Sequence, residues 1–175
     1  MANTIEIGVL AFQGAFMEHE ECLKHAITEA QHEGILKGRE VKIRQVRAAQ
    51  DIEGLRGLIL PGGESTTMAK FLEKNNFSEV INQWRQGNGH GKPVVWGTCA
   101  GLILLADKLQ DPKIGGQCSL GGINITATRN VYGRQTESFE VPLTLLDKDL
   151  QKGTYGITFE FKIRFFIIQF LIPMI

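Results

Sequence analysis

Cysteine is scarce in this sequence, and the few cysteines are not arranged in pairs. The 175 residues include only Cys22, Cys99 and Cys118, with no Cys-x-x-Cys spacing. An odd number of widely separated thiols argues against a disulfide framework, and neither the cysteines nor the four histidines have the spacing of zinc ligands. We therefore expect no metal site and place the protein in a reducing, cytoplasmic compartment.

An excess of charge and a long apolar run are also missing. Lysine plus arginine and aspartate plus glutamate both number 19, so the formal net charge is zero and no overall field attracts nucleic acid or an anionic membrane. No segment reaches the roughly 18 apolar residues of a membrane-spanning helix. The first residues lack the basic and apolar pattern of a signal peptide. We expect neither nucleic acid nor a membrane among the partners.

The composition is that of one globular domain with alternating strands and helices. Hydrophobic residues make up 43% and charged residues 22% of the chain, which is long enough for a sizeable core. Apolar runs and periodicities predict strands at 5–12, 41–46, 57–60 and 94–96, and helices at 17–33, around 68–72 and around 77–84. This alternation predicts an α/β fold with a mainly parallel sheet and helices on both faces, and with ligands outside the carboxyl ends of the strands.

The most informative stretch is 94–106, where an apolar strand leads into Gly-x-Cys-x-Gly and an apolar helix follows. A nucleophile on a sharp strand-to-helix turn has strained backbone angles and needs small neighbours, which Gly97 and Gly101 provide for Cys99. The amino end of the following helix would also favour the thiolate form of Cys99. A buried structural cysteine beside a packing glycine is the alternative; the flanking strand and helix favour the nucleophile.

A second motif, Pro-Gly-Gly-Glu-Ser at 61–65, directly follows the third predicted strand. Glycines at a strand tip let backbone N–H groups turn inward, as an oxyanion hole requires, and Ser65 or Thr66 can cap the next helix. The alternative is a plain strand–turn–helix junction. Because parallel strands end at one edge, we expect this loop, Cys99 and the turn at Gln13 and Gly14 to lie together.

Four segments of the sequence carry a family resemblance: 8–14, 60–68, 96–101 and 129–139. In this order they resemble the glutaminase subunits of pyridoxal 5′-phosphate synthases, which are class I glutamine amidotransferases with a flavodoxin-like fold. The likeness covers residues from about 5 to about 146. It implies that L-glutamine is hydrolysed to glutamate and that the ammonia passes to a partner synthase subunit for vitamin B6 synthesis. It implies no cofactor in this chain, because a thiolate suffices for the reaction.

The resemblance also assigns roles to individual residues. Cys99 corresponds to the nucleophile that forms a thioester with the substrate. The implied substrate-binding residues are Gly63, Glu64, Ser65 and Arg129, with Ile163 and Arg164 similar to an Ile-Arg contact pair of the family. The implied oxyanion and partner-interface residues are Gly62, Gln13 and Gly14. In this family the oxyanion site becomes ordered on the synthase subunit, so the isolated chain is expected to be nearly inactive.

One departure from the family pattern concerns the general base. The family completes its triad with a His-x-Glu pair near the C-terminus, in which the histidine takes the thiol proton. The histidines of this sequence, His19, His25, His32 and His90, all precede Cys99. Three fall on the first predicted helix and one in a polar loop, so we expect none of them to replace the missing base.

The last residues depart from the family as well. We expect an incomplete amidotransferase domain over 1–156 and an apolar tail over 157–175, in which Phe165 and Phe166 replace the Ala-Pro that should follow Arg164. Truncation, alternative splicing or a faulty gene model would each explain this tail, and the full reading frame would decide between them.

The sequence leaves three hypotheses for the function. The first is an active glutaminase, the second is a catalytically inactive relative that only docks on the synthase subunit, and the third is a different cysteine hydrolase. The four segments argue against the third.

Overall fold

The computed structural model describes residues 4–74, 76–87, 91–110 and 119–128. Strands and helices alternate along this part of the chain, as predicted. The elements are β1 (Thr4–Leu10), α1 (Phe16–His32), β2 (Glu40–Val46), the 3₁₀ turn η1 (Ala49–Ile52), β3 (Gly57–Leu60), α2 (Ser65–Lys74), α3 (Phe77–Arg85), β4 (Val94–Gly97), α4 (Ala100–Leu105), β5 (Ala106–Gln110) and β6 (Ile123–Thr128).

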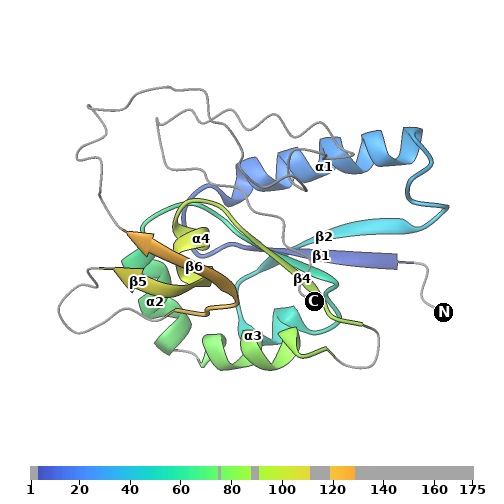
Figure 1. Cartoon of the computed structure of the whole chain (residues 1–175). Coiled ribbons are helices and arrows are strands. Elements are labelled where there is room, and N and C mark those ends of the chain that lie inside the picture. The colour runs from blue at the N-terminus through green and yellow to red at the C-terminus, as the bar shows by residue number, and fades with distance from the viewer. Residues whose placement is uncertain (1–3, 75, 88–90, 111–118, 129–175) are drawn as a thin grey trace, which may run out of the picture.

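Four of these strands form one parallel sheet in the order β2-β1-β3-β4. Leu10 at the end of β1 pairs with Val46 of β2, and Leu60 at the end of β3 pairs with Gly97 of β4. Because all neighbours are parallel, the carboxyl ends of β1, β3 and β4 lie at one edge (Figure 1). β5 and β6 form a separate parallel pair. The predicted mainly parallel sheet is confirmed, and the strand order is that of flavodoxin-like folds.

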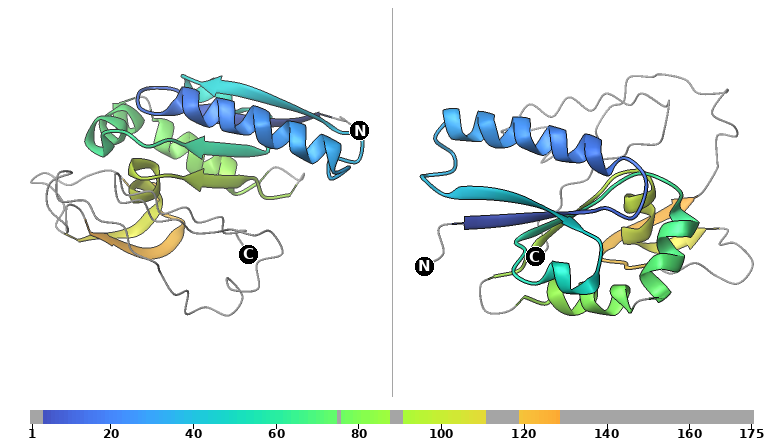
Figure 2. Two further views of the ribbon diagram at one scale, coloured as in Figure 1. Left: turned by 90° about the horizontal axis from the view of Figure 1, so that it is seen from above. Right: turned by 180° about the vertical axis from the view of Figure 1, so that it is seen from behind.

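Helices lie on both faces of the four-stranded sheet. Figure 1 and the right-hand view of Figure 2 show α1 along one face and α3 along the other. The main core lies between the sheet and the three helices α2, α3 and α4. Its fully buried side chains include Leu10, Leu60, Leu72, Phe77, Ile81 and Leu104. The expected apolar faces of α2 and α3 are therefore confirmed, since their spacing of three or four residues places the apolar positions on one side.

Helix α1 is packed differently, because none of its 17 residues is buried. Leu23, Ile27 and Ala30 recur on one side of the helix and are half-buried against the sheet. Cys22 and Ala26, which share the apolar spacing in the sequence, are exposed instead. Only a narrow stripe of α1 therefore contacts the sheet.

Strand β1 ends two residues before the predicted boundary at residue 12. The N–H of Ala11 still donates to the carbonyl oxygen of Val46 at 2.9 Å, but the chain then turns away. The ring of Phe12 packs against Phe71 and Phe77, with centroid distances of 3.6 and 5.1 Å. The chain thus leaves the strand where the ring of Phe12 packs between α2 and α3, and the next residues continue along the carboxyl edge of the sheet.

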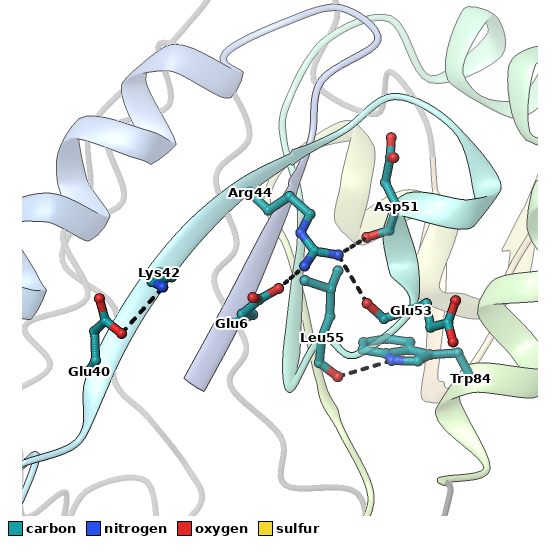
Figure 3. Close-up of polar contacts among 8 residues, drawn as sticks. All are labelled: Glu6, Glu40, Lys42, Arg44, Asp51, Glu53, Leu55 and Trp84. Carbon is teal, nitrogen blue, oxygen red and sulfur yellow. Dashed lines mark hydrogen bonds and ion pairs between the residues drawn. The ribbon is translucent and has the colours of Figure 1, made fainter. Parts of the chain in front are cut away.

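The edge strand β2 is held by a set of polar contacts shown in Figure 3. Arg44 forms an ion pair with Glu6 of β1 and donates to the carbonyl oxygens of Asp51 and Glu53, at 3.2 and 3.0 Å. On the neighbouring helix, the indole N–H of Trp84 donates to the carbonyl oxygen of Leu55 at 3.1 Å. These contacts join β2, β1, η1 and α3 without using any predicted site residue.

Among the described residues, no helix has both the length and the apolar character needed to cross a bilayer.

Candidate active site

Cys99 lies on a sharp turn between β4 and α4. Its φ of 50° and ψ of −108° lie in a region that non-glycine residues rarely adopt. A methyl group added at Gly97 would lie 2.6 Å from the carbonyl carbon of Gly101, and one added at Gly101 would lie 2.0 Å from the carbonyl oxygen of Leu60. The two glycines are therefore needed for the turn to close against itself and against β3. This is the strained strand-to-helix geometry that the Gly-x-Cys-x-Gly motif predicts.

The loop after β3 runs directly past the cysteine. A methyl group added at Gly62 would lie 3.3 Å from Cβ and 4.0 Å from Sγ of Cys99. The backbone N–H of Thr98 donates to the carbonyl oxygen of Leu60 at 3.0 Å, which fixes the two strand ends to each other. The structure thus brings together Cys99 and the glycine loop, which are 37 positions apart in the sequence.

The turn after β1 completes this group of three loops. Gly14 has a φ of +82°, and a methyl group there would lie 1.9 Å from the carbonyl oxygen of Gly62, so only glycine fits. The N–H of Ala15 donates to the same carbonyl oxygen at 3.1 Å. The sequence prediction that the turn at 13–14 lies beside the glycine loop is confirmed.

Gln13 contacts the glycine loop through both atoms of its side-chain amide. Its Oε1 accepts from the backbone N–H of Glu64 at 3.3 Å, and its Nε2 donates to the carbonyl oxygen of Glu64 at 3.4 Å. The same amide lies against Gly63, where an added methyl group would be 2.5 Å from Nε2. In this arrangement the N–H of Glu64 is directed to Gln13.

The side chain of Glu64 is used at the amino end of α2. Its Oε1 accepts from the N–H of Thr66 at 3.1 Å, and its Oε2 accepts from the N–H and hydroxyl of Thr67 at 2.7 and 2.9 Å. Burial alone would raise the pKa of Glu64, but these hydrogen bonds outweigh it and lower the pKa to about 2.

The predicted caps, Ser65 and Thr66, lie inside the helix, and Ser65 is buried. The capping prediction was therefore wrong, since Glu64 is the capping residue.

His19, on the first turns of α1, lies against the residues that precede the cysteine. Its Nε2 is 2.9 Å from the hydroxyl oxygen of Thr98, and its ring meets that of Trp96 edge to face with centroids 5.6 Å apart. Burial lowers the pKa of His19, against the opposing effect of Glu18, so the ring is neutral at neutral pH. Sequence reasoning missed this neighbour, because no local pattern connects two residues 79 positions apart.

Several predicted residues lie outside the described part of the chain: Arg129, Ile163, Arg164, His90, Cys118 and the whole tail 157–175. Within the described part, Cys22 and Cys99 are free thiols, and His25 and His32 are exposed on α1. The described histidines, cysteines and carboxylates form no group of three or more that could hold a metal ion. What the arrangement provides is a cysteine held in a strained turn, next to a glycine-rich loop whose backbone is already ordered by Gln13.

Known proteins are similar to this chain in sequence and in fold. The model of the SNO glutamine amidotransferase family matches residues 9–163. A probable pyridoxal 5′-phosphate synthase subunit pdx2 from Dictyostelium discoideum is 40% identical over 153 residues, covering 82% of this chain and 58% of its own length. The pyridoxal 5′-phosphate synthase subunit PdxT from Corynebacterium jeikeium is 46% identical over 143 residues, covering 82% of this chain and 64% of its own length.

A solved structure described as a glutamine amidotransferase matches with a TM-score of 0.59 at 38% identity, covering 77% of this chain and 62% of that one. The chain therefore spans about three fifths of the length of these relatives.

Proposed function

This chain belongs to the SNO glutamine amidotransferase family, and from that premise we propose that it hydrolyses L-glutamine to glutamate and ammonia with Cys99 as the nucleophile. The observation that carries the proposal is the backbone of Cys99, held at a φ of 50° beside the Gly62 loop. Strain of this kind persists only where surrounding contacts impose it, and it is characteristic of nucleophile turns.

The proposed reaction has two halves. The Cys99 sulfur gives up its thiol proton and attacks the side-chain amide carbon of glutamine; a C–S bond forms, the C–N bond breaks, and the nitrogen takes up that proton and leaves as ammonia. Water then hydrolyses the thioester, which releases glutamate and regenerates the thiol. In each half a negative charge develops on the carbonyl oxygen of the group under attack, first the amide and then the thioester, and nearby backbone N–H groups would stabilise it. We assign this role to the loop at Gly62 and Gly63. By family likeness, the proposed substrate contacts are Gly63, Glu64, Ser65, Arg129, Ile163 and Arg164.

Gln13 and Gly14 support a role for a partner in activation. The N–H of Glu64, which adjoins the proposed oxyanion site, is occupied by Gln13. We infer that the described arrangement is a resting one, and that a pyridoxal 5′-phosphate synthase subunit docks near Gln13 and Gly14, shifts this contact and receives the ammonia. The described thiols are free, and a reducing compartment keeps thiols in this form, so we propose the cytoplasm.

A second candidate function is docking on the synthase subunit without catalysis. The observation that favours it is where the described histidines lie: Nε2 of His19 contacts the hydroxyl of Thr98, and His25 and His32 are exposed on α1. Without a base, the thiol proton has no assigned acceptor among the described residues. Under this reading the chain would keep the partner surface and lose ammonia release.

One assay separates the two functions. Ammonia release from glutamine is measured with and without a synthase subunit, for the unchanged chain, for Cys99→Ala and for Cys22→Ala as a matched thiol control. Release that depends on Cys99 and increases with the synthase supports the glutaminase. No release above the Cys99→Ala control contradicts it, and co-purification with the synthase in that case supports docking alone. An acid quench with labelled glutamine, followed by mass spectrometry of the Cys99 peptide, would detect the thioester directly.

A further inference from the structure

Seven consecutive residues, 13–19, contact both of the loops that form the candidate site. On one side, Gln13 pairs with the backbone of Glu64, and the N–H of Ala15 donates to the carbonyl oxygen of Gly62. On the other side, His19 reaches the hydroxyl of Thr98 at 2.9 Å. The start of α1 therefore bridges the glycine loop and the residue next to the nucleophile.

Thr98 is the point through which this bridge would act on Cys99. Thr98 is only 3% exposed, and its backbone is fixed in both directions: its N–H donates to Leu60, and its carbonyl oxygen accepts from Gly101 at 2.9 Å. Its side chain is thus the remaining part of Thr98 that another element can bind, and such a contact would fix the backbone conformation of the turn. Because the strained backbone of Cys99 begins at the next peptide bond, a rotation of Thr98 would be passed directly to the cysteine.

His19 is suited to bind the Thr98 hydroxyl and keep it in place. The ring is half-buried and packed edge to face on Trp96 of β4, so Trp96 and Thr98, the residue after the strand, together fix its orientation. A neutral imidazole can either donate to the Thr98 hydroxyl or accept from it. The neighbouring charged group on its own helix is Glu18. The described contact of the ring nitrogen is with Thr98, so His19 acts through another residue.

We propose that His19 is a positioning residue, which through Thr98 holds Cys99 in its strained and reactive orientation and connects it to the start of α1. The inference rests on the proposed function only in taking Cys99 as the reactive thiol. It adds a residue to the site that the sequence motifs do not contain.

The test measures how fast iodoacetamide alkylates Cys99, by mass spectrometry of its peptide and relative to the exposed Cys22 in the same molecule. The variants are His19→Leu, which removes the hydrogen bond, His19→Gln, which keeps a polar group near Nε2, and Thr98→Val, which removes the hydroxyl at nearly constant shape. His25→Leu, on the exposed side of the same helix, is the matched control, and circular dichroism verifies that each variant is folded.

Losing one hydrogen bond between neutral groups corresponds to a roughly two- to tenfold change. We expect His19→Leu and Thr98→Val each to slow alkylation of Cys99 by that factor, His19→Gln to restore most of the rate, and the double variant to be no slower than either single one. An unchanged or faster reaction in folded His19→Leu, or additive effects in the double variant, would overturn the proposal. The assay needs neither glutamine nor a synthase, so it can fail while ammonia release succeeds, and the reverse.

Discussion

The two faces of the sheet are built from helices of very different burial. On one face, α2 and α3 contribute five fully apolar buried residues, Met68, Ala69, Leu72, Phe77 and Ile81. On the other face, α1 is the longest helix described and buries none of its residues. Yet side chains at this end of the molecule contact the loops of the candidate site. Gln13, in the turn before α1, contacts Glu64, and His19, in the first turns of α1, contacts Thr98.

This difference indicates that α2 and α3 mainly stabilise the fold, whereas α1 mainly positions the loops of the candidate site. Burial of apolar surface supplies the main favourable free energy of folding, so the face under α2 and α3 should account for most of it. A helix with few buried contacts opens locally at low free energy. We therefore expect helix α1 to move at lower cost than α2 and α3, and its first turns, which contact Gly62 and Thr98, to carry such a movement to the site. The following predictions test this division, from the largest expected effect to the smallest.

Matched leucine substitutions on the two faces should differ most. Leu72 on α2 is 0% exposed, so Leu72→Ala should lower the free energy of unfolding by about 2–5 kcal/mol. Leu23 on α1 is half-buried, and Leu23→Ala should lower it by about 1 kcal/mol. Urea unfolding followed by circular dichroism measures both. Equal losses would mean that α1 contributes as much to the core as α2 does, and the division would be wrong.

A methyl group at a tightly packed glycine should be the next largest effect. Gly101 lies where an added methyl group would be 2.0 Å from the carbonyl oxygen of Leu60, so Gly101→Ala should cost roughly 1–3 kcal/mol of stability and slow alkylation of Cys99. Gly34, at the end of α1, has a φ of +69° and open space around it. Gly34→Ala should cost only about 1 kcal/mol and leave Cys99 unaffected. Thermal unfolding and thiol alkylation of both variants provide the comparison.

The amino ends of the two helices should respond differently to acid. Glu64 caps α2 with a carboxylate whose pKa is lowered from 4.5 to about 2, so its contribution is complete above pH 4.5 and is lost as the pH falls toward about 2. Glu64→Gln should lower stability at neutral pH by about 0.3–1 kcal/mol, reduced by salt because the group is exposed. Acid titration of both proteins by circular dichroism should show curves that converge at low pH. Parallel curves would rule out the cap. Helix α1 has no such side-chain cap at Ala15.

The smallest effect is expected from His19. Burial holds its pKa below the ordinary 6.5, so the folded state favours the neutral ring, and the stability that this ring contributes is lost as the pH falls from 6.5 toward the folded pKa. Urea midpoints at about pH 7.5 and about pH 5.5 should therefore differ less in His19→Gln than in the unchanged protein. His25→Gln on the exposed side of α1 serves as the control. A pH dependence that survives in His19→Gln would assign it to another group.

Much of the candidate site could be predicted because it depends on local backbone requirements. The turn at Cys99 needs small residues on both sides, and the turn at Gly14 needs a positive φ, so the sequence displays both demands as glycines. The hydrogen bond between the side chain of Gln13 and the backbone of Glu64 joins residues 51 positions apart, and no sequence period indicates it. The cap of α2 was predicted at the wrong residues because serine and threonine are the usual caps, and the longer side chain of Glu64 reaches the same N–H groups from one residue earlier.

By itself, the sequence determined the alternation of strands and helices, the parallel sheet, the two glycine-rich loops and the family, because each follows from periodicity, small residues at sharp turns or segments shared with relatives. Only the tertiary structure decided that His19 faces Thr98, that Gln13 occupies the N–H of Glu64, and that no residue of α1 is fully buried. The physical reason is that these features depend on how a helix is rotated and seated against strands distant in the sequence, and packing of the whole domain sets that geometry.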